Sequence, residues 1–298
     1  MPVRYRSAEE DSARWTGFPF RDGDIVISTR SKTGTTWVQM ICALLVFQTP
    51  DLPEPLARLS PWLDWLVTPV DDVVARLSAQ THRRFIKTHT PLDGVPVEPR
   101  VTYLVTARHP LDMAVSLYHQ GDNIDRARLA RLLGSAEPAE RRPARQGVHE
   151  WLLSWIDADA DPQAELDSLP GVLWHVSDAW ARRAAPNVAL VHYDDLLADL
   201  DGQMRRLAGL LDIAVPPAVW PGLVEAATFG AMRSRADRLA PGGVLRDRQA
   251  FFRRGGSGAG RELLSAAELA RYHARAAALA PDDLLAWLHR EPGGAGVG

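Results

Sequence analysis

The sequence predicts an α/β fold in which a central parallel β-sheet is flanked by helices. Three observations predict it. Short β-branched runs alternate with helical stretches along the chain, which is the pattern of strand–helix–strand units. Residues 24–37, DIVISTRSKTGTTW, read as a buried strand that breaks into a polar turn before an apolar helix. Polar candidate site residues end the predicted strands, where parallel sheets bind their ligands.

Composition limits the classes of protein to consider. The 298 residues are 46% apolar, so we expect one domain over residues 1–290 and a flexible Gly-rich tail, 291–298. The net charge of −3 argues against a general nucleic-acid binder. The single cysteine, Cys42, excludes an intramolecular disulfide framework. Because residues 1–20 lack a signal-peptide pattern and no apolar run is long enough to cross a membrane, we expect a soluble cytoplasmic protein.

The first third of the chain contains the opening unit and a proline-rich connection. After an N-terminal segment, residues 1–23, the strand and helix of the opening unit extend to about Phe47. Five prolines in residues 50–70 predict irregular structure, and a short helix follows at 71–80. Four apolar side chains of the connection either cover the core, the interpretation we prefer, or line an apolar acceptor pocket: Trp62, Leu63, Trp65 and Leu66.

The rest of the chain predicts three more strands and several helices. The strands are expected at residues 84–89, 102–106 and 187–193. The helices are expected at 111–119, 148–156, 172–185, from Asp194 to about Leu211, and once or twice within 265–290. Two Arg-rich segments lack a regular pattern: 121–145, interpreted as a mobile lid or surface insertion, and 228–262.

The turn at residues 31–36 has the chemistry of an anion cradle. A strand–turn–helix order leaves free backbone N–H groups at the helix start. Gly34 lets the backbone approach a ligand, Lys32 supplies a positive charge, and the threonines supply hydroxyls. An ATP-binding loop has its lysine directly after the last glycine, whereas Lys32 precedes Gly34. An ordinary polar connection between strand and helix is the alternative.

A second set of residues suits a second anionic group. Arg108 follows the third predicted strand, and Ser116 lies on the helix after it. Arg253–Arg254 lie in the late Gly-rich segment, which we interpret as a flap that orders over a phosphate, with a solvated basic loop as the alternative. Trp37 and Phe229 are candidates to sandwich a base. The set describes a nucleotide with two separated phosphates better than a triphosphate.

His89 is the candidate general base. A histidine near its ordinary pKa removes a proton from a hydroxyl at neutral pH. Lys32 and Lys87 flank the expected transfer site and would stabilise charge on the transferred group and the leaving phosphate. A purely structural histidine is the alternative. The nine histidines show no metal-ligand spacing, so no metal is expected.

Six ordered stretches resemble motifs of the cytosolic-type sulfotransferase family. Ser31–Trp37 is similar to its 5′-phosphosulfate loop PKSGTTW, and Phe85–Pro91 to its KTHxP segment. Tyr103–Ser116 is similar to its YxxRNPxDxxVS stretch, and Phe251–Gly258 to its FxRKGxxG flap. The remaining two are Asn187–Leu196, similar to the strand leading into YEDL, and Thr228, Phe229 and Met232, similar to the SFxxM adenine contact.

The resemblance implies a P-loop-like three-layer fold and an enzyme that uses 3′-phosphoadenosine 5′-phosphosulfate (PAPS) and releases PAP. A sulfuryl group would move in line to an acceptor hydroxyl. His89 would be the base, Lys32 would assist departure of the phosphate, Lys87 would stabilise the transferring group, and Ser116 would hold Lys32 aside until the acceptor arrives. The implied nucleotide-binding residues are Lys32, Thr33, Gly34, Thr35, Thr36, Trp37, Arg108, Ser116, Tyr193, Thr228, Phe229, Arg253, Arg254 and Gly255.

Two departures from the family pattern affect the flap and the assembly. The family continues its flap as GDWK, whereas residues 258–261 read GAGR. The family's dimer motif is not recognisable in residues 261–270, so a dimer of that kind is unsupported. A nucleotide-dependent small-molecule kinase and a non-catalytic nucleotide-binding protein are the alternative functions. The acceptor is expected to be a small-molecule hydroxyl compound bound by residues 50–80, 121–156 and 235–250, with a weak indication of a hydrophobic alcohol or phenol.

Overall fold

Four parallel strands form the sheet at the centre of the computed structural model, which describes residues 2–135 and 146–290. Their order is β2–β1–β3–β4, with bounds Phe85–Thr88, Ile25–Thr29, Thr102–Ala107 and Val188–His192. Ile25 pairs with Phe85 on one side and with Thr102 on the other. Parallel pairing brings all carboxyl ends to one edge of the sheet, so the predicted strand-end residues meet there.

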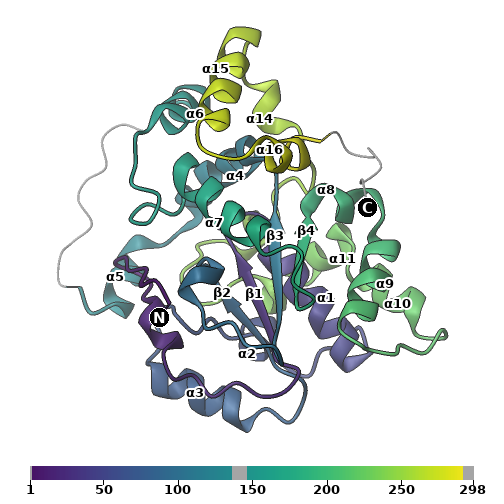
Figure 1. Cartoon of the computed structure of the whole chain (residues 1–298). Coiled ribbons are helices and arrows are strands. Elements are labelled where there is room, and N and C mark those ends of the chain that lie inside the picture. Colours follow the sequence, from purple (N-terminus) through teal and green to yellow (C-terminus); the bar gives the residue numbers. More distant parts are fainter. Residues whose placement is uncertain (1, 136–145, 291–298) are drawn as a thin grey trace.

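Alternate residues of β1 face opposite layers of helices. Ile25 and Ile27 belong to an apolar core with α1, Thr35–Phe47, whereas Val26 belongs to another core with Trp15 of the N-terminal segment. This follows from the two-residue period of side chains along a strand. Helices therefore cover both faces of the sheet (Figure 1), which confirms the predicted α/β class with flanking helices.

The remaining helices extend these layers around the sheet. On the α1 side lie α2 (Leu56–Leu59), α8 (Tyr193–Ala198), α9 (Leu200–Leu210), α10 (Trp220–Ala226), α11 (Phe229–Ser234) and α12 (Ala236–Leu239). Another core is built from α4 (Pro110–Asn123), α6 (Val148–Asp157), α7 (Leu169–Ala181), α14 (Ala259–Glu262), α15 (Ala266–Ala277) and α16 (Asp282–Leu288). Two further helices, α3 (Val70–Ala79) and α5 (Arg126–Leu132), lie towards the N-terminal segment (Figure 1).

Several predicted boundaries are wrong for local reasons. α7 begins at Leu169, earlier than predicted, because the Ser168 side chain caps it by accepting a hydrogen bond from the Gly171 N–H group. The helix predicted from Asp194 to Leu211 is two helices, since Asp199 between them has a non-helical backbone and caps the second. Tyr193 begins α8 rather than ending β4.

The segments predicted to be irregular contain short helices. Residues 228–262 hold α11, α12, α13 (Arg248–Phe251) and α14, and residues 121–135 hold α5 and the end of α4. Helices of four to seven residues complete only one or two turns, so they leave no hydrophobic period in the sequence. Residues 136–145 of the predicted lid and the predicted tail, 291–298, lie outside the described residues.

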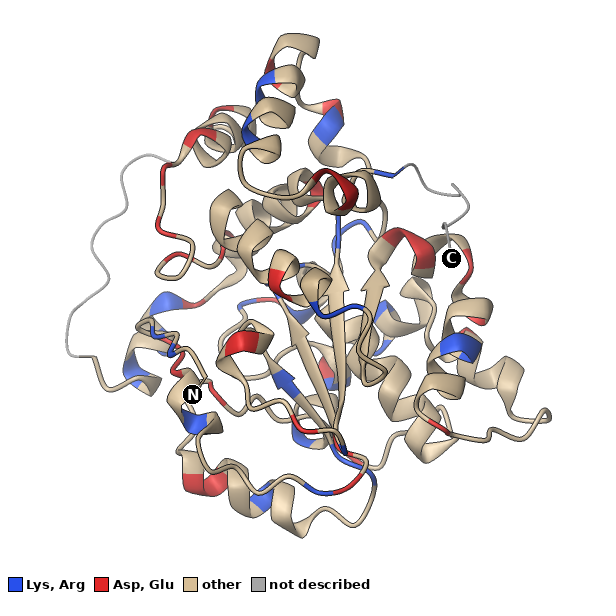
Figure 2. Ribbon diagram, viewed as in Figure 1, with Lys and Arg blue, Asp and Glu red and all other residues tan. Residues whose placement is uncertain are grey.

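The outer surface carries charges of both signs. Figure 2 shows acidic and basic residues interspersed over the outer helices, in keeping with the net charge of −3. Among residues 2–135 and 146–290, no helix is both long and apolar enough to cross a membrane.

Candidate active site

The turn between β1 and α1 forms a backbone cradle at the carboxyl edge of the sheet. Gly34 is the N-cap of α1, with a φ of 114°, and no side chain caps this helix end. The first N–H groups of α1 are therefore available to an anion. A Cβ atom on Gly34 would lie 3.1 Å from Cδ2 of Tyr193, so both the positive φ and this close approach favour glycine.

Two threonine side chains of the cradle hold the turn together. Thr33 Oγ1 donates to the Arg30 carbonyl oxygen at 2.8 Å and lies 3.0 Å from Thr106 Oγ1. Thr35 Oγ1 lies 2.6 Å from Thr29 Oγ1. Thr35 still lines the cavity described next, whereas Thr33 is buried and does not.

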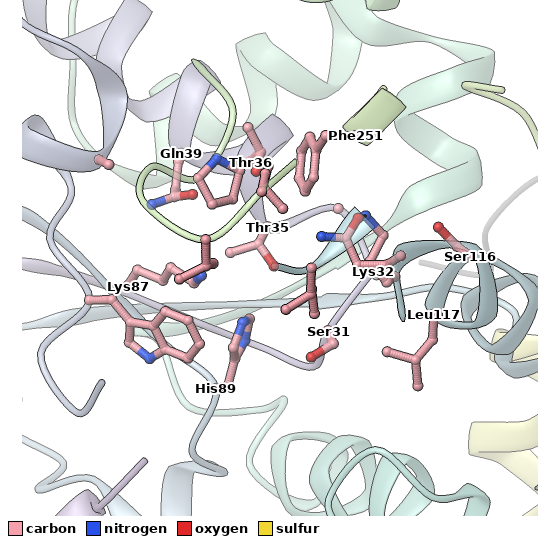
Figure 3. Close-up of a pocket in the computed structure, with 18 of the residues that line it drawn as sticks. Ser31, Lys32, Thr35, Thr36, Gln39, Lys87, His89, Ser116, Leu117 and Phe251 are labelled. Atoms are coloured by element: carbon pink, nitrogen blue, oxygen red, sulfur yellow. Dashed lines mark hydrogen bonds between the residues drawn. The ribbon is translucent and has the colours of Figure 1, made fainter. Parts of the chain in front are cut away.

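One cavity of about 1220 Å³ joins the cradle to the other predicted site residues (Figure 3). It is lined by all four predicted catalytic residues, His89, Lys32, Lys87 and Ser116. The predicted nucleotide-binding residues that also line it are Gly34, Thr35, Thr36, Trp37, Arg108, Tyr193, Phe229, Arg253, Arg254 and Gly255. Thr228 does not; its hydroxyl caps α11 by accepting from the Ala231 N–H group. The fold therefore brings together residues that span most of the chain.

The His89 ring is held by the main chain through one of its two nitrogen atoms. Its Nδ1 is hydrogen-bonded to the Thr29 carbonyl oxygen. Because a carbonyl oxygen only accepts, we assign the proton to Nδ1, which leaves Nε2 as the free base. Burial, with the nearby charges of Lys87 and Arg30, lowers the pKa of His89 well below its usual value, so the ring is neutral at pH 7. Trp62 packs edge-on against the ring, with centroids 4.5 Å apart.

Within residues 2–135 and 146–290, neither Lys32 nor Lys87 forms an ion pair with a carboxylate. Lys32 Nζ lies 3.4 Å from Gln120 Oε1 and 4.0 Å from the centroid of the Phe251 ring, and Lys87 Nζ lies 3.6 Å from that of Trp62. Burial and then the charge of Arg108 lower the pKa of Lys32 to about 7. Burial lowers the pKa of Lys87 to about 8. A bound anion would relieve both effects.

The predicted contact between Lys32 and Ser116 is absent from the described structure. Gln120 lies one helical turn beyond Ser116 on α4, and its side-chain oxygen receives the Lys32 ammonium instead. Figure 3 shows Ser116 and Lys32 on the same side of the cavity. Ser116 therefore stays a candidate ligand contact, and Gln120 takes the restraining position in this state.

Arg108 connects the cradle to the late flap. Its guanidinium donates to the Gly256 carbonyl oxygen at 2.6 Å and lies 4.2 Å from the ring centroid of Tyr193. Its buried Nε atom has no hydrogen-bond partner among the residues that the structure describes, which marks a polar group with capacity for a ligand. Asp112 holds the flap against α4, because its carboxylate accepts the N–H groups of Gly258 at 2.8 Å and Gly260 at 2.9 Å.

The two flap arginines differ in their surroundings. Burial and the charge of Arg108 lower the pKa of Arg253. Arg253 is therefore near enough to Arg108 for both to contact one anionic group of a ligand. Arg254 instead pairs with Glu262 at 3.3 Å, and both side chains are largely exposed. Arg254 is therefore the weaker candidate for holding a ligand.

Two aromatic side chains form the proposed base-binding walls. The Trp37 indole donates to the Ala227 carbonyl oxygen at 2.8 Å, which fixes its plane. Gly255 has a φ of 67° and lies so close to Phe229 that a Cβ atom would be 2.4 Å from that ring. Both aromatic residues line the cavity, as the sequence predicts.

Sequence reasoning missed several residues of the site. Arg30 donates to the His89 carbonyl oxygen and forms a 2.7 Å ion pair with Asp167. Its position directly after β1 was a usable signal, since the same rule identified His89 and Arg108. Gln120 and Glu10 also line the cavity, and no motif points to them. Trp62 and Trp65 line it as well, whereas Leu63 is core, so the preferred interpretation of that loop is only partly correct.

The chain is similar to known proteins over most of its length. A family model described as the sulfotransferase domain matches residues 22–278. A glycolipid sulfotransferase of Mycobacterium tuberculosis is 43% identical over 307 residues, covering 96% of this chain and 94% of that protein. Human Sulfotransferase 2B1 is 25% identical over 268 residues, covering 86% of this chain and 65% of that protein.

Solved structures share the fold. Retinol dehydratase in complex with androsterone and the inactive cofactor PAP aligns with a TM-score of 0.66 at 20% identity, covering 91% of this chain and 84% of that one. Mouse sulfotransferase SULT7A1 complexed with PAP aligns with a TM-score of 0.63 at 18% identity, covering 88% and 86%. At these identities the likeness establishes the fold alone.

Proposed function

Because this chain belongs to the sulfotransferase family, we propose that it transfers a sulfuryl group from PAPS to an acceptor hydroxyl, with His89 as the general base. The observation that carries the proposal is the His89 ring itself. Its Nδ1 is held by the Thr29 carbonyl oxygen, and the ring lines one cavity with Lys32 and Lys87. A neutral imidazole between two cations suits proton removal from a hydroxyl while negative charge moves to a leaving phosphate.

The nucleotide fits the polar groups of the cavity in two places. The N–H groups at the start of α1, with Lys32 and Thr36, would hold the 5′-phosphosulfate. Arg108, whose Nε atom lacks a hydrogen-bond partner in the described part of the chain, would hold the 3′-phosphate together with Ser116 and Arg253. Trp37, Phe229 and Tyr193 would enclose the adenine. Thr33 would contribute its backbone and Thr228 would position α11, since neither side chain lines the cavity.

Proton and charge balance then assign a role to each group. His89 Nε2 accepts the hydroxyl proton as the acceptor oxygen bonds to sulfur, and the bond from sulfur to the phosphate oxygen breaks on the opposite side. Lys87 stabilises the transferring group, and Lys32 stabilises the phosphate that departs. Arg30 positions His89 by holding its carbonyl oxygen. No step in this scheme requires a metal.

PAP binding at pH 8 is expected to take up about one proton. In the free protein the pKa of Lys32 is about 7 and that of Lys87 about 8, so at pH 8 the first ammonium is mostly deprotonated and the second about half protonated. An anion raises both pKa values, and protons therefore move from buffer to protein. Titration calorimetry in buffers of different ionisation enthalpy measures the uptake. The proton uptake should be smaller at pH 6. Proton release at pH 8 would contradict the placement of Lys32 and Lys87 at the anion.

A transfer assay tests the function against its alternatives. Purified protein would be incubated with labelled PAPS and a panel of alcohols, phenols, sugars, glycolipids and amines, without added metal. Label on a hydroxyl compound supports the proposal. Magnesium-dependent phosphate transfer from ATP would instead indicate a kinase, and tight PAP binding without any transfer would indicate a non-catalytic nucleotide-binding protein.

The relatives at 43% identity carry the name glycolipid sulfotransferase, so we propose a glycolipid as the acceptor class. Within the cavity, apolar side chains such as Leu56, Val73 and Leu129 would contact the lipid. We also propose that residues 1–290 act as one domain. The cytoplasmic location stays a prediction, and a dimer of the family's kind stays unsupported.

A further inference from the structure

We propose that Glu10 is a specificity-determining residue: its carboxyl group hydrogen-bonds hydroxyl groups of the acceptor other than the one that is sulfated. The enzyme would then favour a sugar head over a plain alcohol of the same chain length. This inference rests on the proposed function, which it deepens by naming the part of the chain that distinguishes acceptors.

The fold places Glu10 firmly in the wall of the reaction cavity. It lines the same cavity as His89, although the two are far apart in sequence. Its backbone forms an antiparallel bridge with Trp65. The Arg14 guanidinium then donates to the carbonyl oxygens of Trp65 at 2.6 Å and Thr68 at 2.8 Å, which fastens the N-terminal segment to this loop. A rigid backbone on both sides suits a residue that selects a ligand.

Two aromatic rings set the spacing between Glu10 and the base. Trp65, the bridge partner of Glu10, stacks on Trp62 with centroids 5.1 Å apart and planes 8° apart. Trp62 in turn meets His89 edge-on at 4.5 Å. The Trp62 face also receives Lys87. Since two ring contacts lie between them, Glu10 addresses a different part of an acceptor whose reacting hydroxyl is at His89.

The Glu10 carboxyl group has capacity for a ligand. Within residues 2–135 and 146–290, no hydrogen bond or ion pair involves its side chain. Arg30 and Lys87 act on the Glu10 carboxyl group through their charge and oppose the rise of its pKa, while their short contacts are made with Asp167, the His89 carbonyl oxygen and the Trp62 ring. Burial, together with Asp64 and Asp167, raises the pKa of Glu10 to about 8. The Glu10 side chain is partly buried, and a carboxyl group withdrawn from water without a partner costs free energy, which a hydroxyl ligand would recover.

Hydroxyl groups match this environment better than a charged amine does. A carboxyl group near neutrality exists in both forms, and a hydroxyl can donate to one and accept from the other. The charges that act on the Glu10 carboxyl group are of both signs, Lys87 and Arg30 against Asp64 and Asp167, so they do not by themselves favour a cationic ligand. The same cavity is lined by Thr68 and Arg76, whose side chains lack a hydrogen-bond or ion-pair partner in the described part of the chain. A donor and acceptor mixture of this kind suits a polyol.

The experiment compares octyl β-glucoside with 1-octanol as acceptors for the wild type, Glu10→Ala and Glu10→Gln. We expect Glu10→Ala to raise the KM for octyl β-glucoside at least tenfold and to change the KM for 1-octanol less than twofold. Glu10→Gln, which keeps an acceptor and a donor, should restore most of the glucoside affinity. PAP affinity should match the wild type in both variants, which reports that the fold and nucleotide site are intact. Asp72→Asn, an exposed carboxylate on α3 outside the cavity, is the matched control.

Other outcomes overturn the inference in distinct ways. An equal rise in KM for both acceptors would make Glu10 a general structural residue. A Glu10-dependent preference for octylamine over octyl β-glucoside would make it an amine site. Binding of octyl β-glucoside to the PAP-loaded protein is measured separately by calorimetry. If binding depends on Glu10 but no sulfuryl transfer occurs, the proposed function is rejected and the subsite is supported. If the Glu10 variants bind octyl β-glucoside as the wild type does, the subsite is rejected.

Discussion

Replacing His89 with alanine is expected to lower kcat by about 10²–10⁴-fold, the usual contribution of a general base. The variant lacks the Nε2 atom that would take the hydroxyl proton. PAP affinity should stay within about twofold of the wild type, because the ring lies at the transfer position and the nucleotide contacts come from the cradle and Arg108. Initial rates with labelled PAPS and calorimetry with PAP measure the two quantities on the same preparation.

Two further variants separate the chemistry of His89 from its packing. Asparagine can place an amide N–H near the position of Nδ1 and keep the hydrogen bond to Thr29, yet it offers no base, so His89→Asn should be as inactive as the alanine variant. His149→Ala is the matched control, since that histidine pairs with Glu268 at a distant, partly exposed position. If transfer and PAP binding fell together in His89→Ala, the assignment of the base would be wrong.

Arg108→Ala is expected to weaken PAP binding by about 1.5–3 kcal/mol, the range of a hydrogen bond to a charged group, or on the order of 10- to 100-fold. The guanidinium lies between the cradle and the flap, and its buried Nε atom has no hydrogen-bond partner within residues 2–135 and 146–290. Adenosine 5′-monophosphate lacks the 3′-phosphate, so its affinity should fall much less. The ratio of the two affinities is therefore the decisive measurement.

This ratio also controls for the structural role of Arg108. Its bond to the Gly256 carbonyl oxygen holds the flap, and loosening the flap would weaken both nucleotides alike. Arg254→Ala, which removes an arginine paired with Glu262, should change PAP affinity only slightly. Unchanged PAP affinity in Arg108→Ala, or an equal loss for both nucleotides, would remove the 3′-phosphate role from Arg108.

Local patterns were enough to predict the fold class and many of the residues that line the cavity. β1, the turn at residues 31–36 and α1 are contiguous, so strand propensity, turn chemistry and helical spacing predict them together. His89 and Arg108 follow strands of a parallel sheet, and that topology alone places their residues at one edge. These predictions need no knowledge of packing, because neighbouring residues and strand direction determine them.

Tertiary contacts decided the rest. Thr33 belongs to the cradle motif, yet its hydroxyl turns inward to the Arg30 carbonyl oxygen. Gln120, rather than Ser116, meets the Lys32 ammonium. Glu10 enters the cavity only because its backbone bridges to Trp65 and Arg14 fastens that loop. Such side chains have no periodic or motif signature, because their partners lie far along the chain. The sequence by itself therefore determined the sheet, the cradle and His89 as the candidate base, while packing between distant segments decided which neighbouring groups surround them.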